Sequence, residues 1–383
     1  MKWEIAKLGD ISKNIQTGPF GSQLHQSDYS ECGIPVVMPK DLVGGKISEE
    51  SIARVDKTHV ERLCRHKIEV GDILYSRRGD VGRCAHVTKK EEGWLCGTGC
   101  LRVTIDSEKA DSRFVFFQLQ HPDTVGWVEK HAVGATMLNL NTTILSSVPI
   151  RLPALEIQKR IADILSAYDD LIENNQKQIK LLEEAARRLY KEWFVDLRFP
   201  GYENTKIVDG VPEGWSRTNI NEILTFHRGY DLTKNEMKAG RYPVVGSTTV
   251  IGYHNEFKIK GPGIVTGRSG SLGKYQFIWD NFWPHNTSLY ISNYKDHNIF
   301  FVYSLLQTVD FASLNNGGAI PTLNRNVLSN IEVIEPEKKL QDVFAKIAEP
   351  QYQKIRNLEK QNNQLKMARD VLLPKLMSGE VEV

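Results

Sequence analysis

Two long stretches of the chain repeat apolar residues at alternating steps of four and three, which is the spacing of a coiled-coil seam. They follow Pro153 and Pro336, positions that suit the first turn of a helix. We therefore predict two helices of about 38 residues, each about 57 Å long. The predicted coiled-coil interface consists of Ile157, Ile161, Ile164, Tyr168, Leu171, Leu182 and Leu189 in the first helix and Leu340, Phe344, Ile347, Leu358, Leu365 and Leu372 in the second.

Helices of this length cannot bury their seams on their own globular parts, so we expect the two seams to pack against each other. Polar residues interrupt both seams: Asn175 and Gln178 in the first, and Gln351, Lys354 and Gln361 in the second. Two interpretations remain open for these residues. They fix the register of the pair at a cost in stability, or they lie at frayed or partner-facing positions.

The chain is an internal repeat in which a globular part is followed by a long helix. WEIAKLGDI at residues 3–11 matches WSRTNINEI at 215–223, and LNTTILSSVPI at 140–150 matches LNRNVLSNIEV at 323–333. The second match has an offset of 183 residues, and the same offset continues through the helices. A period this long indicates a duplicated pair of domains and excludes a solenoid of short repeats.

Short β-type runs alternate with turns in both globular parts, and each part has one aromatic-rich helical run near its end, at residues 114–120 and 300–307. We predict an α+β fold with two mixed α/β domains in pseudo-twofold repeat, separated by two long helices. The predicted organisation is a first domain at 1–152, a helix at 153–197, a linker at 198–212, a second domain at 213–336, a helix at 337–378 and a tail at 379–383.

Composition is that of an ordinary globular protein, with 40% hydrophobic and 25% charged residues. The first residues lack the apolar core of a signal peptide, and no apolar run is long enough to span a bilayer, so we expect a cytoplasmic protein. The net charge is only +2. A nucleic-acid ligand would therefore require clustered charge or phosphate contacts supplied by a partner.

Five cysteines all lie in the first third of the chain, at Cys32, Cys64, Cys84, Cys96 and Cys100. Their odd number favours reduced thiols over a disulfide framework. Cys96 and Cys100 are closely spaced, but no second Cys or His pair at finger spacing completes a zinc site. We expect small packed side chains and no metal.

Arginine-glycine turns follow an apolar strand in both halves. RRGDVG at residues 77–82 places Arg77 and Arg78 before its glycines and Arg83 after them, and RSGSLG at 268–273 contains Arg268 and Ser269. Arginine beside such a turn can bind a phosphate or pair with guanine. The alternative is a hairpin turn with solvated arginines.

Further polar turns complete the set of candidate contacts. TGPFGSQL at residues 17–24 can present Phe20, Ser22 and Gln23 to a base, or can be a tight packed turn, and HRGYDL at 227–232 is its poorer counterpart. GATMLNLN at 134–141 and GGAIPTLN at 317–324 carry Asn and Thr that suit base edges or cap the following turn. The additional candidates are Asn139, Asn141, Arg228, Asn324 and Arg325 in or next to these segments, and Lys40 directly after the run IPVVMP.

Catalytic motifs are absent from the sequence. No Pro-Pro dipeptide provides the motif of an amino-methyltransferase, and the two Gly-Lys pairs are followed by Ile47 and Tyr275 instead of the Ser or Thr of a P-loop. No HExxH motif is present. These absences agree with the family resemblance given next, which implies that this chain is not an enzyme.

Two unlike globular domains, each followed by a matching long helix, resemble the specificity subunit of type I restriction-modification systems over the whole chain. The segments that carry the resemblance are residues 18–37, LPALEIQKRIADILSAYDDLI at 152–172, KEWF at 191–194 and 317–324. The resemblance implies that each globular domain is a target-recognition domain for double-stranded DNA and that the helices pack antiparallel and set the distance between them. It also implies two modification subunits and a restriction subunit as partners, which would carry S-adenosylmethionine, ATP and Mg, with no cofactor on this chain and no membrane contact.

The repeat has a duplicated framework, but the side chains at its turns differ between the halves. We therefore predict an asymmetric bipartite DNA target whose half-sites are separated by roughly 34 Å, one helical turn. Two alternatives remain: a coiled-coil scaffold that binds only protein, and a DNA methyltransferase of an unusual type.

Overall fold

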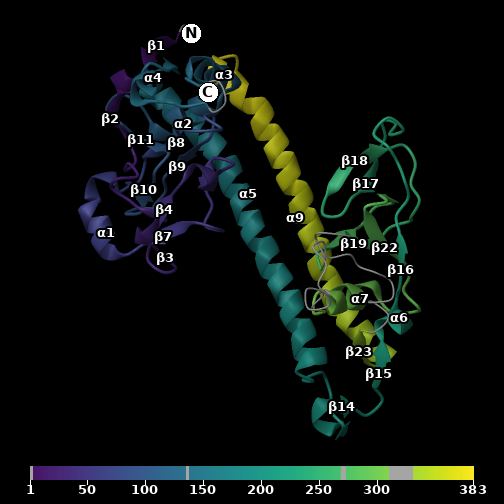
Figure 1. The fold of residues 1–383 in the computed structure, drawn as a ribbon. Helices are drawn as coiled ribbons and strands as arrows, with labels where there is room; N and C mark the ends of the chain where they lie inside the picture. The colour runs from purple at the N-terminus through teal and green to yellow at the C-terminus, as the bar shows by residue number, and fades with distance from the viewer. Residues whose placement is uncertain (1–2, 135–137, 269–272, 310–330) are drawn as a thin grey trace. The chain divides into compact units, whose positions relative to one another are not determined.

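The computed structural model describes residues 3–134, 138–268, 273–309 and 331–383 (Figure 1). The chain forms two compact units. Unit 1 comprises residues 1–174 and 361–383, and unit 2 comprises residues 175–360. Both units are mixed α/β structures, which confirms the predicted α+β class.

Unit 1 is built on a four-stranded antiparallel sheet that packs against its own helices. The strand order of this sheet is β2 (Ser12–Thr17), β11 (Cys100–Ile105), β8 (Ile73–Ser76) and β9 (Cys84–His86). A second sheet has the order β10 (Leu95–Cys96), β4 (Ile34–Val37), β7 (Ala53–Val55) and β3 (Tyr29–Ser30). Two strand pairs complete unit 1: β1 (Glu4–Lys7) with β12 (Pro149–Leu152), and β5 (Leu42–Val43) with β6 (Lys46–Ile47).

The short helices of unit 1 begin at side chains that cap them. They are α1 (Lys57–Arg62), α2 (Ser112–Gln120), α3 (Pro122–His131) and α4 (Thr142–Ser146). Asp111 accepts hydrogen bonds from the backbone N–H groups of Arg113 and Phe114, which starts α2. The aromatic run of α2 is then buried in the core, as the apolar pattern at residues 114–120 predicts.

Unit 2 repeats this arrangement. Its central sheet has the order β16 (Thr225–Arg228), β22 (Ser288–Asn293), β19 (Gly263–Gly267) and β20 (Tyr275–Ile278). The second sheet has the order β18 (Val250–His254), β17 (Tyr242–Val245) and β21 (Trp283–Pro284), and the strand pairs are β15 (Ser216–Asn219) with β23 (Glu332–Glu335) and β13 (Ile207–Val208) with β14 (Val211–Pro212). The short helices are α6 (Ile220–Ile223) and α7 (Ile299–Leu306).

The sequence repeat is visible in individual hydrogen bonds. Leu8 N–H donates to the carbonyl of Val148 at 2.9 Å, and Ile220 N–H donates to the carbonyl of Ile331 at 2.9 Å. These four residues are paired by the sequence alignment of the two halves. The repeat therefore preserves the local backbone geometry as well as the apolar pattern.

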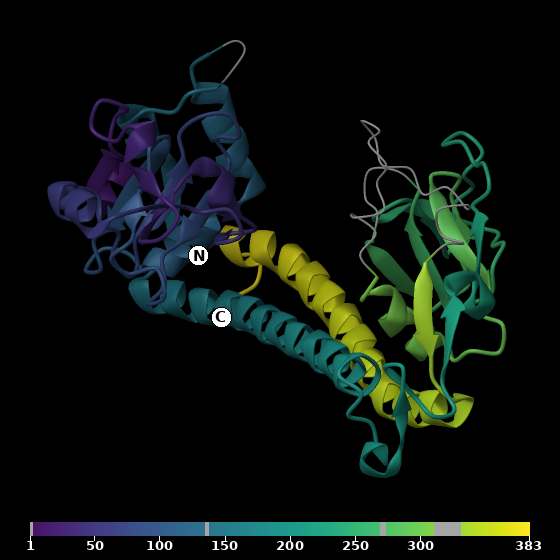
Figure 2. The ribbon, with the colours of Figure 1, turned by 60° about the horizontal axis from the view of Figure 1, so that its bottom comes forward.

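The two long helices are α5 (Leu155–Tyr190), which continues into a π-helical turn at Lys191–Val195, and α9 (Lys338–Ser378). In unit 1, Ile161 and Leu165 of α5 share a core with Leu376 and Met377 of α9. In unit 2, the other end of α5 packs against the first turns of α9. Each unit therefore contains an antiparallel pairing of its two helical segments (Figure 1, Figure 2).

Most residues of the predicted seam are buried or partly buried, and two are exposed. Ile161, Phe344 and Leu358 are buried, and the partly buried positions are Ile157, Ile164, Tyr168, Leu182, Leu189, Leu340, Leu365 and Leu372. Leu171 is 49% exposed and Ile347 is 42% exposed, so neither lies in the buried seam. The adjacent residues Ile172 and Ala348 are buried instead, because an α-helix has 3.6 residues per turn and drifts against a strict heptad.

Polar residues within the seam behave differently from one another. Asn175 is buried, and so is Asn362, which the apolar pattern alone did not single out. Gln178 and Gln351 are partly buried, whereas Lys354 and Gln361 are exposed. Burial favours a register-fixing role for Asn175, and exposure favours a solvent-facing or partner-facing position for Lys354.

Proline occurs inside α9, which continues through it. Pro350 lies in the first third of the helix, and it has no N–H to donate to the carbonyl four residues earlier. Phe344, Ala348, Tyr352 and Ile355 are nevertheless buried on both sides of it, so tertiary packing holds the helix across the missing hydrogen bond. In the part of the chain that the structure describes, no helix combines the length and apolarity needed to cross a membrane.

Candidate nucleic-acid interface

Three loops of unit 1 meet at one end of its two main sheets. Gly18, after β2, donates its N–H to the carbonyl of Cys100 at 3.0 Å, and Arg77, after β8, donates its N–H to the carbonyl of Gly99 at 2.8 Å. Thr98 donates from its hydroxyl to the carbonyl of Pro19 at 2.9 Å. The turn at residues 97–99 thus joins the glycine loop at 18–21 to the arginine turn at 77–79.

Close backbone approach explains the glycine at the centre of this junction. A Cβ atom on Gly18 would lie 2.0 Å from the carbonyl oxygen of Gly97, so no larger residue fits there. Gly21 has open space around it, so this argument does not extend to the second glycine of the loop. Residue type is therefore dictated by packing at Gly18 and not at Gly21.

Phe20 and Arg77 contact each other in the junction, with Phe20 exposed and Arg77 partly buried. The guanidinium carbon of Arg77 lies 5.8 Å from the centroid of the Phe20 ring, and Phe20 is 52% exposed. Gln23 accepts a hydrogen bond from Phe20 N–H through its side-chain oxygen at 3.2 Å. Gln23 therefore holds the Phe20 loop, whereas Phe20 and the exposed Ser22 face solvent.

The segment at residues 138–141 joins the same surface. Leu140 N–H donates to the carbonyl of Arg77 at 2.8 Å, and Gly79 N–H donates to the carbonyl of Leu138 at 3.1 Å. Among the described residues, the buried Oδ1 atom of Asn139 and the Nε atom of Arg77 have no hydrogen-bond partner. Buried polar atoms of this kind normally have a partner, so this junction has unused hydrogen-bonding capacity.

Asn141 has a different role from Asn139. Its side chain accepts a hydrogen bond from Ile144 N–H at 2.8 Å and forms the N-cap of α4. Of the two sequence-based interpretations of Asn141, helix capping is the one that the structure supports.

Three further candidates of unit 1 differ in whether their charged groups already have a partner within the protein. Arg83 pairs with Asp80 at 2.7 Å, and Lys40 donates from Nζ to the carbonyl of Ser51 at 2.8 Å. Arg78 is exposed, and no partner of its guanidinium lies among the described residues. The positive charge available on this surface therefore comes mainly from Arg77 and Arg78.

Unit 2 builds the same junction from different side chains. Gly229 N–H donates to the carbonyl of Ser288 at 3.1 Å, and a Cβ atom on Gly229 would lie 2.1 Å from the carbonyl oxygen of His285. Arg268 N–H donates to the carbonyl of Thr287 at 3.1 Å, which is the position that Arg77 occupies in unit 1. The sequence match between Arg77 and Arg268 is thus confirmed by equivalent backbone hydrogen bonds.

The remaining candidates of unit 2 are only partly described. Arg228 is exposed, and its guanidinium lies 3.8 Å from the carboxylate of Asp231. Ser269, Asn324 and Arg325 lie outside the described residues.

The turn before the last strand of each central sheet was not identified from the sequence. Its side chains are Thr98 in unit 1 and His285, Asn286 and Thr287 in unit 2. The usable signal was the polar turn that precedes the apolar strands LRVTI and SLYIS.

Three cysteine side chains of unit 1 are buried. Cys84, Cys96 and Cys100 are buried among apolar side chains, and burial raises the pKa of Cys96 to about 12. These thiols are therefore neutral packing groups. No cluster of metal-binding side chains occurs within the described residues.

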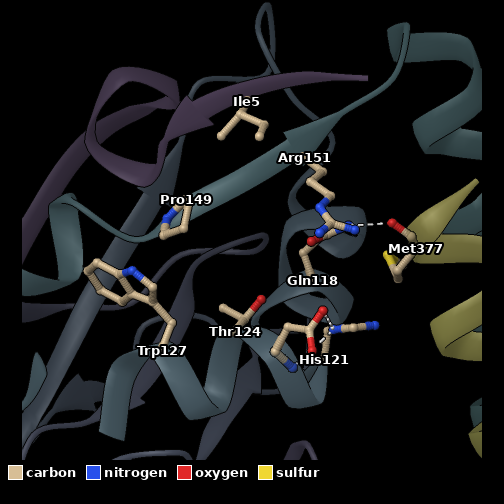
Figure 3. Close-up of a pocket in the computed structure, with 9 residues that line it drawn as sticks. Ile5, Gln118, His121, Thr124, Trp127, Pro149, Arg151 and Met377 are labelled. Carbon is tan, nitrogen blue, oxygen red and sulfur yellow. Dashed lines mark hydrogen bonds and ion pairs between the residues drawn. The ribbon is translucent and has the colours of Figure 1, made fainter. Parts of the chain in front are cut away.

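Unit 1 also has a cavity of about 210 Å³ between α3, the β1–β12 pair and the end of α9 (Figure 3). Gln118 donates from Nε2 to the carbonyl of Met377 at 3.3 Å across one side of it. His121 accepts a hydrogen bond from Asp123 N–H at 3.2 Å, and burial lowers the pKa of this histidine. His121 therefore caps the start of α3 through its Nδ1 atom.

Several proteins of known type are similar to this chain over its whole length. The type I restriction enzyme MjaIX specificity subunit of Methanocaldococcus jannaschii is 26% identical, and the match covers 100% of this chain and 94% of that protein. The type I restriction enzyme HindI specificity subunit of Haemophilus influenzae is 21% identical, with 99% of each chain covered.

A solved structure shows the same fold. The crystal structure of the type I restriction-modification system S subunit from M. genitalium superposes with a TM-score of 0.67 at 19% identity, covering 98% of this chain and 96% of that chain. The family model for the type I restriction modification DNA specificity domain matches residues 1–184 and 212–367, which is most of the chain. This protein therefore belongs to the type I restriction-modification DNA specificity family.

Proposed function

We propose that this chain is the sequence-specificity subunit of a type I restriction-modification complex and binds an asymmetric bipartite DNA target. The observation that carries the proposal is the junction that recurs in both units. It has the same backbone hydrogen bonds around Gly18 and Gly229 and an arginine at equivalent positions, Arg77 and Arg268. Because the two units carry the same backbone junction, each unit can bind one part of the same DNA duplex through it.

Different side chains on the shared framework support an asymmetric target. Unit 1 presents Phe20 and Arg78, whereas unit 2 presents Arg228 and Asp231 at its corresponding loop. Base edges in the major groove have distinct patterns of donors and acceptors, so unlike side chains select unlike bases. Each unit recognises one half-site in this proposal, and the long helices set the unread spacer.

Methylation and DNA cleavage belong to partner subunits in this proposal. Two modification subunits carry S-adenosylmethionine, and a restriction subunit uses ATP and Mg. The names of the relatives support this division, because they describe specificity subunits of restriction enzymes. The modest net charge of +2 supports it as well, because the partners would then supply many of the phosphate contacts.

Methylation mapping tests the proposal directly. The gene is deleted from its host, and the methylated positions of the genome are compared with those of the parent and of a complemented strain. We expect a bipartite motif with two unlike halves to disappear on deletion and to return on complementation. Methylation that is unchanged by the deletion, or a motif with two identical halves, would contradict the proposal.

A further inference from the structure

The turn before the last strand of the central sheet differs sharply between the two units. In unit 1 it consists of Gly97, Thr98 and Gly99, and a Cβ on Gly97 would lie 2.6 Å from the carbonyl of Val37. In unit 2 the same turn carries the three larger side chains of His285, Asn286 and Thr287. The equivalence follows from the backbone, because the N–H groups of Gly97 and His285 each donate at 2.9 Å to the last residue of the neighbouring strand.

This turn of unit 2 is anchored on both sides of Asn286. The ring of His285 contacts Thr287 Oγ1 at 3.0 Å through Nδ1 and the carbonyl of Leu232 at 3.2 Å through Nε2. Ser247 donates from its hydroxyl to the carbonyl of Thr287 at 2.8 Å. The backbone of the turn is thus held in place, so the geometry of Asn286 is set before any ligand binds.

Asn286 forms a hydrogen bond with Asp231. An ionised carboxylate can only accept, so Asn286 donates from Nδ2 to Asp231 Oδ1. The amide oxygen of Asn286 and the second carboxylate oxygen of Asp231 then remain as acceptors. The Asp231 side chain is 80% exposed, so these acceptors lie on the surface of the junction.

We propose that Asn286 and Asp231 form the pair that determines base specificity in unit 2, and that they select a base with an exocyclic amino group, adenine or cytosine. This inference rests on the proposed function. Adenine N6 and cytosine N4 are the hydrogen-bond donors that bases present in the major groove, whereas guanine O6 and thymine O4 are acceptors and are repelled by the same oxygens. A carboxylate is also a poor contact for a phosphate, which favours a base edge as its ligand.

Arg228 makes a carboxylate tolerable at this position. Its guanidinium lies 3.8 Å from Asp231 and reduces the electrostatic repulsion between that carboxylate and the DNA backbone. The equivalent turn of unit 1 has Thr98 where unit 2 has Asn286, and its hydroxyl donates to Pro19. The pair is therefore a property of unit 2 alone, as the recognition of two unlike half-sites requires.

The test compares methylation motifs in strains that express this chain with the modification subunit of its own system. The variants are Asn286→Ala and Asp231→Asn, with Arg77→Ala as a marker for the half-site of unit 1. We expect both unit 2 variants to accept guanine or thymine at one position of one half-site at least about tenfold more often than the wild type. The half-site altered by Arg77→Ala should stay unchanged in both.

Glu256→Gln is the matched control, because Glu256 is an exposed carboxylate of unit 2 that lies outside the junction. Thermal unfolding of each purified variant shows whether it folds, and the exposure of Asp231 makes Asp231→Asn the safer substitution. Folded variants that leave the motif unchanged, or that alter the same half-site as Arg77→Ala, would overturn the assignment. A wild-type chain that gives no bipartite motif would instead refute the proposed function.

Discussion

Gln158 of α5 donates a hydrogen bond from Nε2 to the carbonyl of Pro153 at 2.9 Å, and Gln341 of α9 makes the same bond to Pro336 at 2.9 Å. Both side chains are buried, with 2% and 1% exposure. Each amide oxygen also contacts the globular part, because Gln158 accepts from Asp111 N–H at 3.0 Å and Gln341 lies 3.0 Å from His297 Nδ1. A repeated buried amide thus joins each long helix to its unit.

Replacement of either glutamine by leucine should destabilise the unit that contains it. The substitution leaves a buried carbonyl and its second partner unpaired, which costs about 1–3 kcal/mol for each group. Hydrogen exchange measured by mass spectrometry should show faster exchange around α2 for Gln158→Leu and around α7 for Gln341→Leu. Gln176→Leu, on an exposed face of α5, is the control. Equal protection in all three variants would show that the buried amides do not anchor the helices.

Arg77 and Phe20 provide a second test, directed at DNA binding. Arg77→Ala should weaken binding by the assembled complex and reduce the salt slope of the affinity by about one, because one phosphate or base contact is lost. Phe20→Ala should weaken binding with a smaller change in the salt slope, since a ring carries no charge. Fluorescence anisotropy at several salt concentrations measures both quantities.

Arg83→Ala is the matched control for Arg77→Ala, because both residues flank the same turn but Arg83 already pairs with Asp80 at 2.7 Å. We expect a smaller loss of affinity for Arg83→Ala than for Arg77→Ala. If the two substitutions have equal effects, the distinction between a free and a paired arginine is wrong.

Sequence patterns located the junction but did not resolve the role of each side chain in it. The glycine loop at 18–21, the arginine turn at 77–79 and the segment at 138–141 were all identified, and the structure joins them through backbone hydrogen bonds. The roles of Asn139 and Asn141 stayed open, because capping and base recognition use the same side-chain groups. Only the helix that follows Asn141 distinguishes it from Asn139.

The turn at residues 285–287 illustrates why the rest was missed. It has no glycine, and its only titratable group is His285, so the sequence marks it only by three polar residues before the apolar strand SLYIS. Its importance comes from Gly229 and Arg268, which lie 56 and 17 residues before His285 in sequence and meet the turn only in the folded sheet. The exposed positions of Leu171 and Ile347 have a similar origin. Leu171 and Ile172 are both apolar, as are Ile347 and Ala348, so composition does not show which residue of each pair is buried in the folded protein.

Histidine burial predicts an acid-sensitive unit 1. Burial lowers the pKa of His86 to about 4 from a usual value of 6.5, and its Nε2 atom lies 3.0 Å from Ser112 Oγ. The unfolded chain therefore binds an additional proton at this residue between pH 6.5 and pH 4, so the contribution of His86 to stability should be constant above pH 6.5 and fall as the pH drops through this window. The largest expected loss from this group is roughly 3 kcal/mol.

Urea unfolding at several pH values measures this effect. His86→Gln should reduce the slope of stability against pH between 6.5 and 4, and some slope should remain because burial also lowers the pKa of His66 to about 4. Ser112→Ala is the control, since it removes the hydrogen bond but keeps the titrating ring. A slope that His86→Gln leaves unchanged would show that His86 does not account for the acid sensitivity.

The last prediction concerns the spacer between the half-sites. Seven residues inserted in α5 after Asn174 and seven in α9 after Lys360 preserve the heptad pattern and lengthen each helix by about 10.5 Å. At about 3.4 Å per base pair, the spacer of the methylated motif should grow by about three base pairs, with both half-sites unchanged.

An insertion in α5 alone should abolish methylation, because the apolar residues that now share a core with α9 would be displaced by two turns. Seven residues added to the linker at 198–212 should leave the spacer as it is, because that segment lies outside both helices. A spacer that stays constant when both helices are lengthened would mean that the helices do not set the distance, and the unread length would then have to be fixed by the partner subunits.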